Sequence, residues 1–142
     1  MIAGQAAGGS VVAYSDATST KLETFRPFSS GYTRGVTLAA GDVNSDHKAD
    51  VIAGTRAGTA AVIRAYSGAT SKLLLSLTPF GGFTGGAAVA AASVTGDAAA
   101  EIVAGQGPGG GAQVSVFDGR TGALDSTFLG ATGSGGIAVG AG

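Results

Sequence analysis

The chain has 142 residues, a net charge of −1, one histidine and no cysteine. Its length favours a single domain. Because 8 basic residues balance 9 acidic ones, no basic surface for nucleic acid or an anionic membrane is expected. The absence of cysteine excludes disulfides and thiolate zinc sites. No apolar run approaches the roughly 18 residues of a membrane span, so no membrane insertion is expected, and no signal peptide is recognised.

Glycine is unusually abundant, at 27 residues, and it is interspersed with Val, Ile and Ala. Glycines interrupt nearly every window in which a helical period of 3.6 residues would have to persist. Short apolar runs between turn residues are typical of strands. The composition therefore predicts an all-β fold.

One unit recurs along the chain with a period near 51 residues. The triplet Ile2-Ala3-Gly4 recurs as residues 52–54 and, with Val for Ile, as residues 103–105. The pattern predicts repeats at about 1–34, 35–85 and 86–135, followed by a final strand at 136–142. The predicted strands, in chain order, are 1–4, 10–14 and 21–25; 35–41, 49–54, 61–66 and 73–77; 86–92, 100–105, 113–117 and 124–128; and 136–142.

Side-chain size favours a β-propeller over a sandwich. The first strand of each repeat is almost entirely Ala, Gly and Val, as expected where strands crowd a common axis. The third strands carry apolar residues on both faces, which fits a blade covered by neighbours on both sides. The aromatic residues are expected to fill the wedges between blades: Phe25, Phe28, Tyr32, Phe80, Phe83 and, in the third repeat, Phe128. Glycines 68, 119 and 122 are expected to supply positive φ angles in the hairpin turns.

The loop DVNSDHKAD, residues 42–50, carries oxygen-bearing side chains at its first, third, fifth and ninth positions. Three carboxylates so close in sequence repel one another unless a cation lies between them. Ca²⁺ takes six to eight oxygen ligands, and alternate residues of a tight loop can direct theirs inward. The loop is not an EF-hand, since Ala53 stands where that motif has its Glu. The predicted ligands are Asp42, Asn44, Asp46, the backbone carbonyl of Lys48, and Asp50.

This loop and its repeats resemble the calcium-binding blades of FG-GAP (VCBS) β-propellers of the integrin-α type. The resemblance extends over essentially the whole chain. It departs from the family at the sixth loop position, where His47 replaces the usual Gly; that position tends to need a positive φ, which His tolerates better than most residues. The resemblance implies Ca²⁺ as the bound ion and an extracellular or cell-surface location.

The second copy of the loop, SVTGDAAAE, is expected to be a weak or empty site. Its ligand positions hold Ser93, Thr95, Asp97 and Glu101, and only two of these are carboxylates. Hydroxyl hydrogen bonds are expected to stabilise this loop in place of an ion.

The strand count predicts an assembly. Twelve strands make three four-stranded antiparallel blades, whereas propeller rings have about four to eight blades. Two chains would form a six-bladed ring if the last strand of each completed the first blade of the other, so a homodimer is predicted. The alternative is a fragment of a longer propeller.

The sequence favours a non-catalytic, calcium-stabilised module with a structural or binding role. The alternative is an adhesion or lectin-like domain that binds a protein or glycan. An enzyme is the least favoured class, because the only histidine, His47, lies within the metal loop. The GxGxxG pattern at 105–110 is not followed by a predicted helix, so no dinucleotide site is expected.

Overall fold

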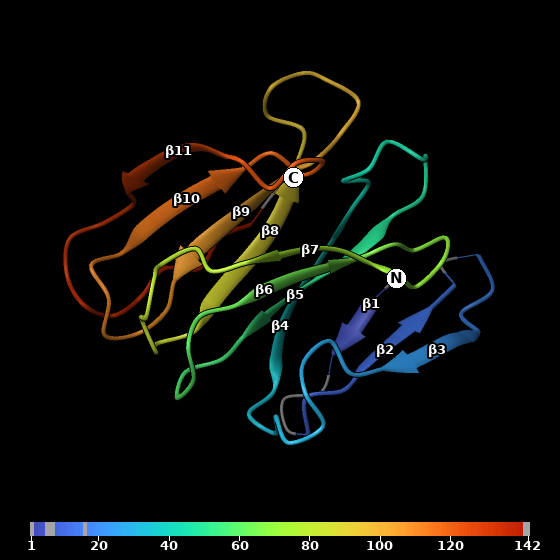
Figure 1. Cartoon of the computed structure of the whole chain (residues 1–142), viewed down its shortest axis with the longest axis horizontal. Helices are drawn as coiled ribbons and strands as arrows, with labels where there is room; N and C mark the ends of the chain where they lie inside the picture. The colour runs from blue at the N-terminus through green and yellow to red at the C-terminus, as the bar shows by residue number, and fades with distance from the viewer. Residues whose placement is uncertain (1, 5–7, 16, 141–142) are drawn as a thin grey trace.

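The computed structural model of the protein describes residues 2–4, 8–15 and 17–140. In this part of the chain eleven antiparallel strands form three sheets, so the all-β prediction is confirmed (Figure 1). The three sheets do not close into a barrel within these residues. The same residues contain no helix that is long and apolar enough to cross a membrane.

In each sheet the strands lie side by side in the order in which they occur in the chain; we call the first strand of a four-stranded sheet its inner strand and the last its outer strand. The first sheet has the order β1-β2-β3, and the other two have the orders β4-β5-β6-β7 and β8-β9-β10-β11. The strand bounds are β1 Ile2–Gly4, β2 Val11–Tyr14, β3 Lys21–Phe25, β4 Val36–Gly41, β5 Asp50–Thr55, β6 Ile63–Tyr66, β7 Leu73–Leu77, β8 Ala87–Ala92, β9 Glu101–Gln106, β10 Gln113–Phe117 and β11 Leu124–Leu129.

The repeat predicted from the sequence recurs in the hairpins between the third and fourth strands. The pairing of β2 with β3, of β6 with β7 and of β10 with β11 shifts register at equivalent points. Each hairpin then closes with the same pair of backbone hydrogen bonds, over residues 15–20, 67–72 and 118–123. The first two hairpin sequences, SDATST and SGATSK, share four of six residues, but the third, DGRTGA, has only the Thr in common with both and still folds into the same local structure.

The glycines of these hairpins meet two different structural requirements, a positive φ angle at one position and close backbone packing at another. Positive φ occurs at Ser19, Ser71 and Gly122, which are equivalent positions. The prediction was therefore right for Gly122 and wrong for Gly68 and Gly119, neither of which has a positive φ. An added Cβ at Gly68 or Gly119 would instead fall far inside the 3.0 Å minimum for Cβ contacts, against the carbonyl oxygen of Ala49 or Ala100.

The twelfth predicted strand is not formed in the part of 136–142 that the structure describes, residues 136–140. Residues 141–142, and Met1 of the first predicted strand, lie outside the described residues. Residues 137–139 nevertheless lie next to β9 of the third sheet, in the same way that β8 lies next to β5 of the second sheet. An added Cβ at Gly54 would be 2.7 Å from the Ala87 carbonyl oxygen, and one at Gly105 would be 2.9 Å from that of Ile137. The segment occupies the place of an inner strand but has no ladder partner among the described residues.

Two apolar clusters join the sheets. The larger lies between the second and third sheets around Ile52, Ile63 and Ile102, all fully buried. The smaller lies between the first and second sheets around Val11 and Tyr32. Small residues permit this close packing, since an added Cβ at Gly41 would be 2.7 Å from the Cβ of Ala91.

Most of the aromatic residues occupy the wedges, as predicted. The Phe25 ring lies edge-on to the Tyr66 ring, with centroids 5.1 Å apart, and so joins β3 to β6. Phe28 packs on Tyr32, and Phe80 packs on Phe83. Phe128 was expected to fill a wedge but is 54% exposed, because no described sheet covers that face of the third sheet.

Candidate metal-binding loop

The loop between β4 and β5 folds its own polar side chains onto its backbone. The two carboxylate oxygens of Asp42 accept hydrogen bonds from the N–H groups of Asp46 (3.1 Å) and His47 (2.7 Å). The Asp46 N–H is shared with Asn44 Oδ1 at 3.0 Å. Because both acceptor oxygens lie about 3 Å from one nitrogen, Asp42 and Asn44 approach each other. Asp46 in turn accepts hydrogen bonds from the Lys48 N–H and the Asn44 amide.

Two residues of this loop have left-handed backbone conformations. Ser45 has φ 62° and His47 has φ 63°. The sixth loop position therefore has the positive φ that the sequence led us to expect, and His47 adopts it without glycine. These turns direct successive N–H groups at the side chains of Asp42, Asn44 and Asp46.

Asp50 differs from Asp42 and Asp46 because its carboxylate binds backbone groups outside the stretch 44–48. Its side chain is fully buried at the start of β5, where Oδ2 accepts a hydrogen bond from the Val43 N–H (2.9 Å) and Oδ1 one from the Gly68 N–H (3.0 Å). Burial raises the pKa of the Asp50 carboxyl, the Gly68 and Val43 N–H groups oppose that rise, and the charges of Asp46 and Asp42 add to it. Asp50 thus ties the metal loop to the adjacent hairpin.

The donor set fits a hard cation in its chemistry, because every predicted ligand atom is an oxygen. Each carboxylate oxygen of Asp42, Asp46 and Asp50 accepts a backbone or amide hydrogen bond and retains a lone pair for a further interaction. Among the described residues, no three or more His, Cys, Asp or Glu side chains gather as a metal site by themselves. Any coordination here would need the Asn44 and Lys48 oxygens as well.

The second loop, between β8 and β9, is held differently. The Glu101 carboxylate accepts hydrogen bonds from the Thr95 hydroxyl (2.5 Å) and the Val94 N–H (2.6 Å). The Ser93 hydroxyl donates to the Asp97 carbonyl, and the Ala99 N–H donates to the Asp97 carboxylate. The bond from Val94 to Glu101 repeats the one from Val43 to Asp50. The ninth position therefore has the same anchoring contact in both loops.

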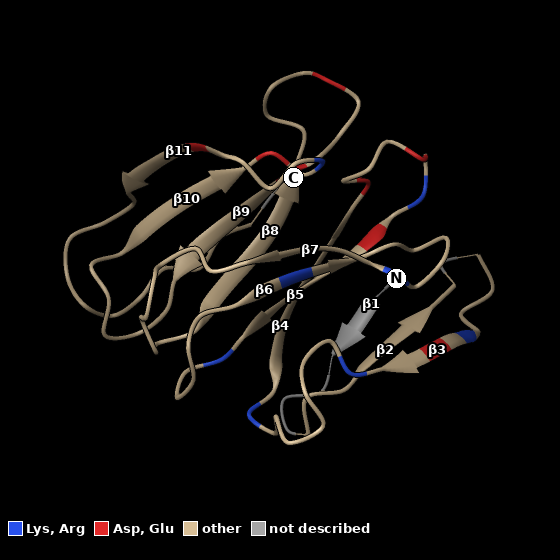
Figure 2. Ribbon diagram, in the orientation of Figure 1, with Lys and Arg blue, Asp and Glu red and all other residues tan. Residues whose placement is uncertain are grey.

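The two ends of the sheets differ in charge (Figure 2). The loops 42–50 and 93–101 and the hairpins lie at one end and carry acidic residues at 42, 46, 97 and 118. The opposite end consists of the loops 26–35, 56–62, 78–86, 107–112 and 130–135, which contain no Asp or Glu. These loops carry Arg26, Arg34 and Arg56.

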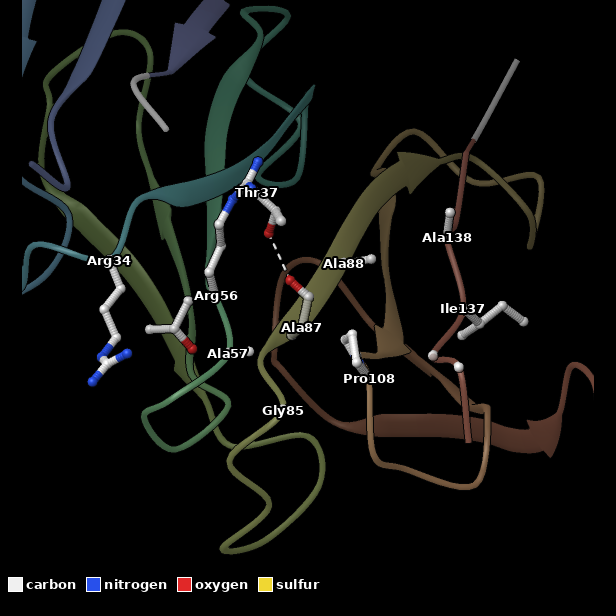
Figure 3. A pocket seen from close by; sticks show the side chains of 14 residues that line it. Arg34, Thr37, Arg56, Ala57, Gly85, Ala87, Ala88, Pro108, Ile137 and Ala138 are labelled. Carbon is white, nitrogen blue, oxygen red and sulfur yellow. Dashed lines mark hydrogen bonds between the residues drawn. The ribbon is translucent and has the colours of Figure 1, made fainter. Parts of the chain in front are cut away.

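A cavity of about 550 Å³ opens at this arginine-bearing end between the inner strands of the second and third sheets. Arg34 and Arg56 line the wall formed by the second sheet, Ala87 and Ala88 of β8 lie between, and Ile137 lies on the other side (Figure 3). Sequence reasoning did not join these arginines, which are 22 positions apart. The only available signal was that glycine replaces both in the next repeat, at 85 and 107.

The comparisons with known proteins bear on the segment that holds the metal loop. Residues 34–71 match the model of the FG-GAP repeat. Comparison with curated proteins gives no significant match, and neither does comparison with solved structures. FG-GAP repeats generally form non-catalytic structural or binding modules and occur in extracellular and cell-surface proteins. The segment 34–71, from the loop before β4 to the hairpin after β6, is therefore similar to an FG-GAP repeat.

Proposed function

We propose that the protein is a non-catalytic, calcium-stabilised β-propeller module that assembles with a second copy of itself in an extracellular setting. The observation that carries the assembly is the pair of incomplete elements. Among the described residues, the first sheet has no inner strand paired with β1, and residues 136–140 lie where an inner strand would lie but pair with no strand. Unpaired strand edges are normally covered in proteins. Mutual pairing of these two elements across a two-fold axis would satisfy both.

The repeat also identifies the side chains that would meet in such a dimer. Within the chain, Phe25 of the first sheet packs on Tyr66 of the second. The equivalent of Phe25 in the third sheet is the exposed Phe128, and the equivalent of Tyr66 in the first sheet is Tyr14. Phe128 would therefore pack on Tyr14 of the partner subunit. Two chains of three sheets would then form six blades, within the usual range of propellers.

Light scattering after gel filtration tests this assembly. We expect a mass of twice 13.4 kDa for the natural chain and a shift toward the monomer for Phe128→Ser. Leu73→Ser is the matched control: Leu73 is 50% exposed but lies in the second sheet, which has neighbours on both sides. A natural chain that runs as a monomer would refute the proposal and favour a segment of a longer propeller.

For the metal, we propose that Ca²⁺ binds at Asp42, Asn44, Asp46, the Lys48 carbonyl and Asp50. Support comes from the convergence of Asp42 and Asn44 on one N–H group and from the raised pKa of Asp50, which reflects a buried charge that a cation would stabilise. The Ser93–Glu101 loop is proposed to bind Ca²⁺ weakly or not at all, since Thr95 already engages the Glu101 carboxylate.

Calorimetric titration with Ca²⁺, combined with thermal unfolding with and without EDTA, tests the metal. A ligand at 100 times its Kd raises the free energy of unfolding by about 2.7 kcal/mol, and a stabilisation of that size gives a readily measured rise in Tm. We expect that rise in the natural chain and its loss in Asp42→Asn. Asp118→Asn, an acidic residue of a hairpin at the same end, should respond to Ca²⁺ like the natural chain. Absence of any heat or Tm change in the natural chain would refute the site.

A further inference from the structure

Two guanidinium groups line the same cavity without a partner of their own. In the described part of the chain, neither the Arg34 nor the Arg56 side chain donates a hydrogen bond. Two other arginines differ: Arg26 donates to the Gly8 carbonyl at 2.7 Å, and Arg64 donates to the Pro27 carbonyl at 2.9 Å while lying over the Phe28 ring. Arg34 and Arg56 are thus exposed at a cavity, and their guanidinium groups have no hydrogen-bond partner among the described residues.

No acidic residue of the loops described around the cavity offsets these two arginines. The loops that surround the cavity contain no Asp or Glu, and the acidic loops lie at the other end of the sheets (Figure 2). A six-residue strand such as β5 spans about 20 Å at roughly 3.3 Å per residue. That distance exceeds the screening length of about 8 Å at physiological salt. The cavity therefore presents a positive potential that the acidic end does not neutralise.

The shape of the cavity fits a small molecule. Its volume of about 550 Å³ lies within the range of roughly 300–1,000 Å³ that is usual for ligand sites. Glycines 85 and 107 stand one repeat period after Arg34 and Arg56, so the wall opposite the two arginines has no arginine at the equivalent positions. Figure 3 shows the Arg34 and Arg56 side chains extending in different directions from the same wall. Each therefore offers a separate contact to an anionic group.

We propose that this cavity binds a small organic oxyanion, whose carboxylate or phosphate group is held by Arg34 or Arg56, while the other arginine adds to the positive potential of the cavity. Guanidinium groups form charge-assisted hydrogen bonds with both kinds of oxyanion. The remaining lining, which includes Thr37, Ala88, Pro108 and Ile137, would surround the uncharged body of the ligand. The lining residues all belong to one chain, and Ile137 among them lies in the segment that the proposed dimer would pair.

Isothermal titration with three hexose probes of similar size tests the site: glucuronate, glucose 6-phosphate and glucose. We expect binding of the two anions at low salt, weakening as salt rises, and none of neutral glucose. Arg34→Gln and Arg56→Gln should each weaken binding about tenfold, which corresponds to about 1.4 kcal/mol. The tighter of the two anions identifies whether the site prefers a carboxylate or a phosphate.

Arg120→Gln is the matched control, because Arg120 is an exposed arginine in a hairpin at the opposite end. It should leave the affinity unchanged. Binding of neither anion to the natural chain, equal binding of glucose, or equal losses from all three substitutions would overturn the proposal. Light scattering on the same samples separates this result from the assembly, since a monomer that binds anions keeps the site and refutes only the dimer.

Discussion

Substitution of Gly68 by Ala should destabilise the protein by breaking the link between the loop 42–50 and the next hairpin. The new Cβ would collide with the Ala49 carbonyl oxygen, which is main chain and cannot rotate away. Relief requires the hairpin to move, and that movement lengthens the 3.0 Å hydrogen bond from the Gly68 N–H to the buried Asp50 carboxylate.

The size of the effect follows from that hydrogen bond. A hydrogen bond to a charged group contributes about 1.5–3 kcal/mol. Replacing glycine by alanine lowers the entropy of the unfolded chain and returns about 0.4–1 kcal/mol. The free energy of unfolding should therefore fall by about 0.5–2.6 kcal/mol, and the steric clash adds to that loss.

Urea unfolding at fixed protein concentration measures the change, with Gly82→Ala as the control. Gly82 has no atom within 4 Å of an added Cβ and does not have a positive φ, so its substitution should be neutral or slightly stabilising. If Gly68→Ala and Gly82→Ala unfold within about 0.5 kcal/mol of each other, the ordinary scatter of surface substitutions, the reasoning about the Asp50 link is refuted.

Two further predictions concern the third sheet. Burial would raise the pKa of Glu101, but hydrogen bonds from Thr95 and from backbone N–H groups outweigh it and hold the pKa below its ordinary value of 4.5. The ionised Glu101 carboxylate therefore contributes fully to the free energy of unfolding above pH 4.5, and this contribution is lost as pH falls through the lowered pKa. Glu101→Gln should therefore lose less stability on acidification than the natural chain does. An equal dependence of the free energy of unfolding on pH in the two proteins would contradict this. Gly105→Val should displace residues 137–139, because a Cβ there meets the Ile137 carbonyl at 2.9 Å. Faster hydrogen exchange at the Ile137 amide, which donates to Gln106, would report the displacement, and unchanged protection would exclude it.

The sequence predicted all eleven strands of the described chain to within about two residues because those features are local. Alternating apolar residues between glycines specify a strand, and the recurrence of the Ile-Ala-Gly triplet sets the period. β11 was predicted to end at Phe128 and continues to Leu129. The segment 136–140, GIAVG, consists of small and apolar residues as β4 and β8 largely do, yet it is not a strand. A strand also needs a hydrogen-bonding neighbour, which composition does not supply.

The candidate site was predictable only in part for the same reason. The spacing of Asp42, Asn44 and Asp46 could be read directly, because those residues contact one another within a few positions. The role of Asp50 as an anchor depends on Gly68, 18 positions away. The shared cavity of Arg34 and Arg56 likewise depends on how two loops meet at one end of the sheets. Contacts of this kind are set by the packing of sheets and leave no periodic signal.

The hairpin position shared by Ser19, Ser71 and Gly122 shows how one backbone geometry can contribute differently to the stability of the fold. A left-handed residue other than glycine costs about 1–2 kcal/mol. Ser71 offsets that cost, because its hydroxyl donates at 2.6 Å to Glu23 and joins the first two sheets. Ser19 has the same φ without such a contact in the described chain, whereas Gly122 avoids the cost altogether. Glycine at position 19 would therefore make the fold more robust, but glycine at position 71 would exchange an inter-sheet tether for local relaxation.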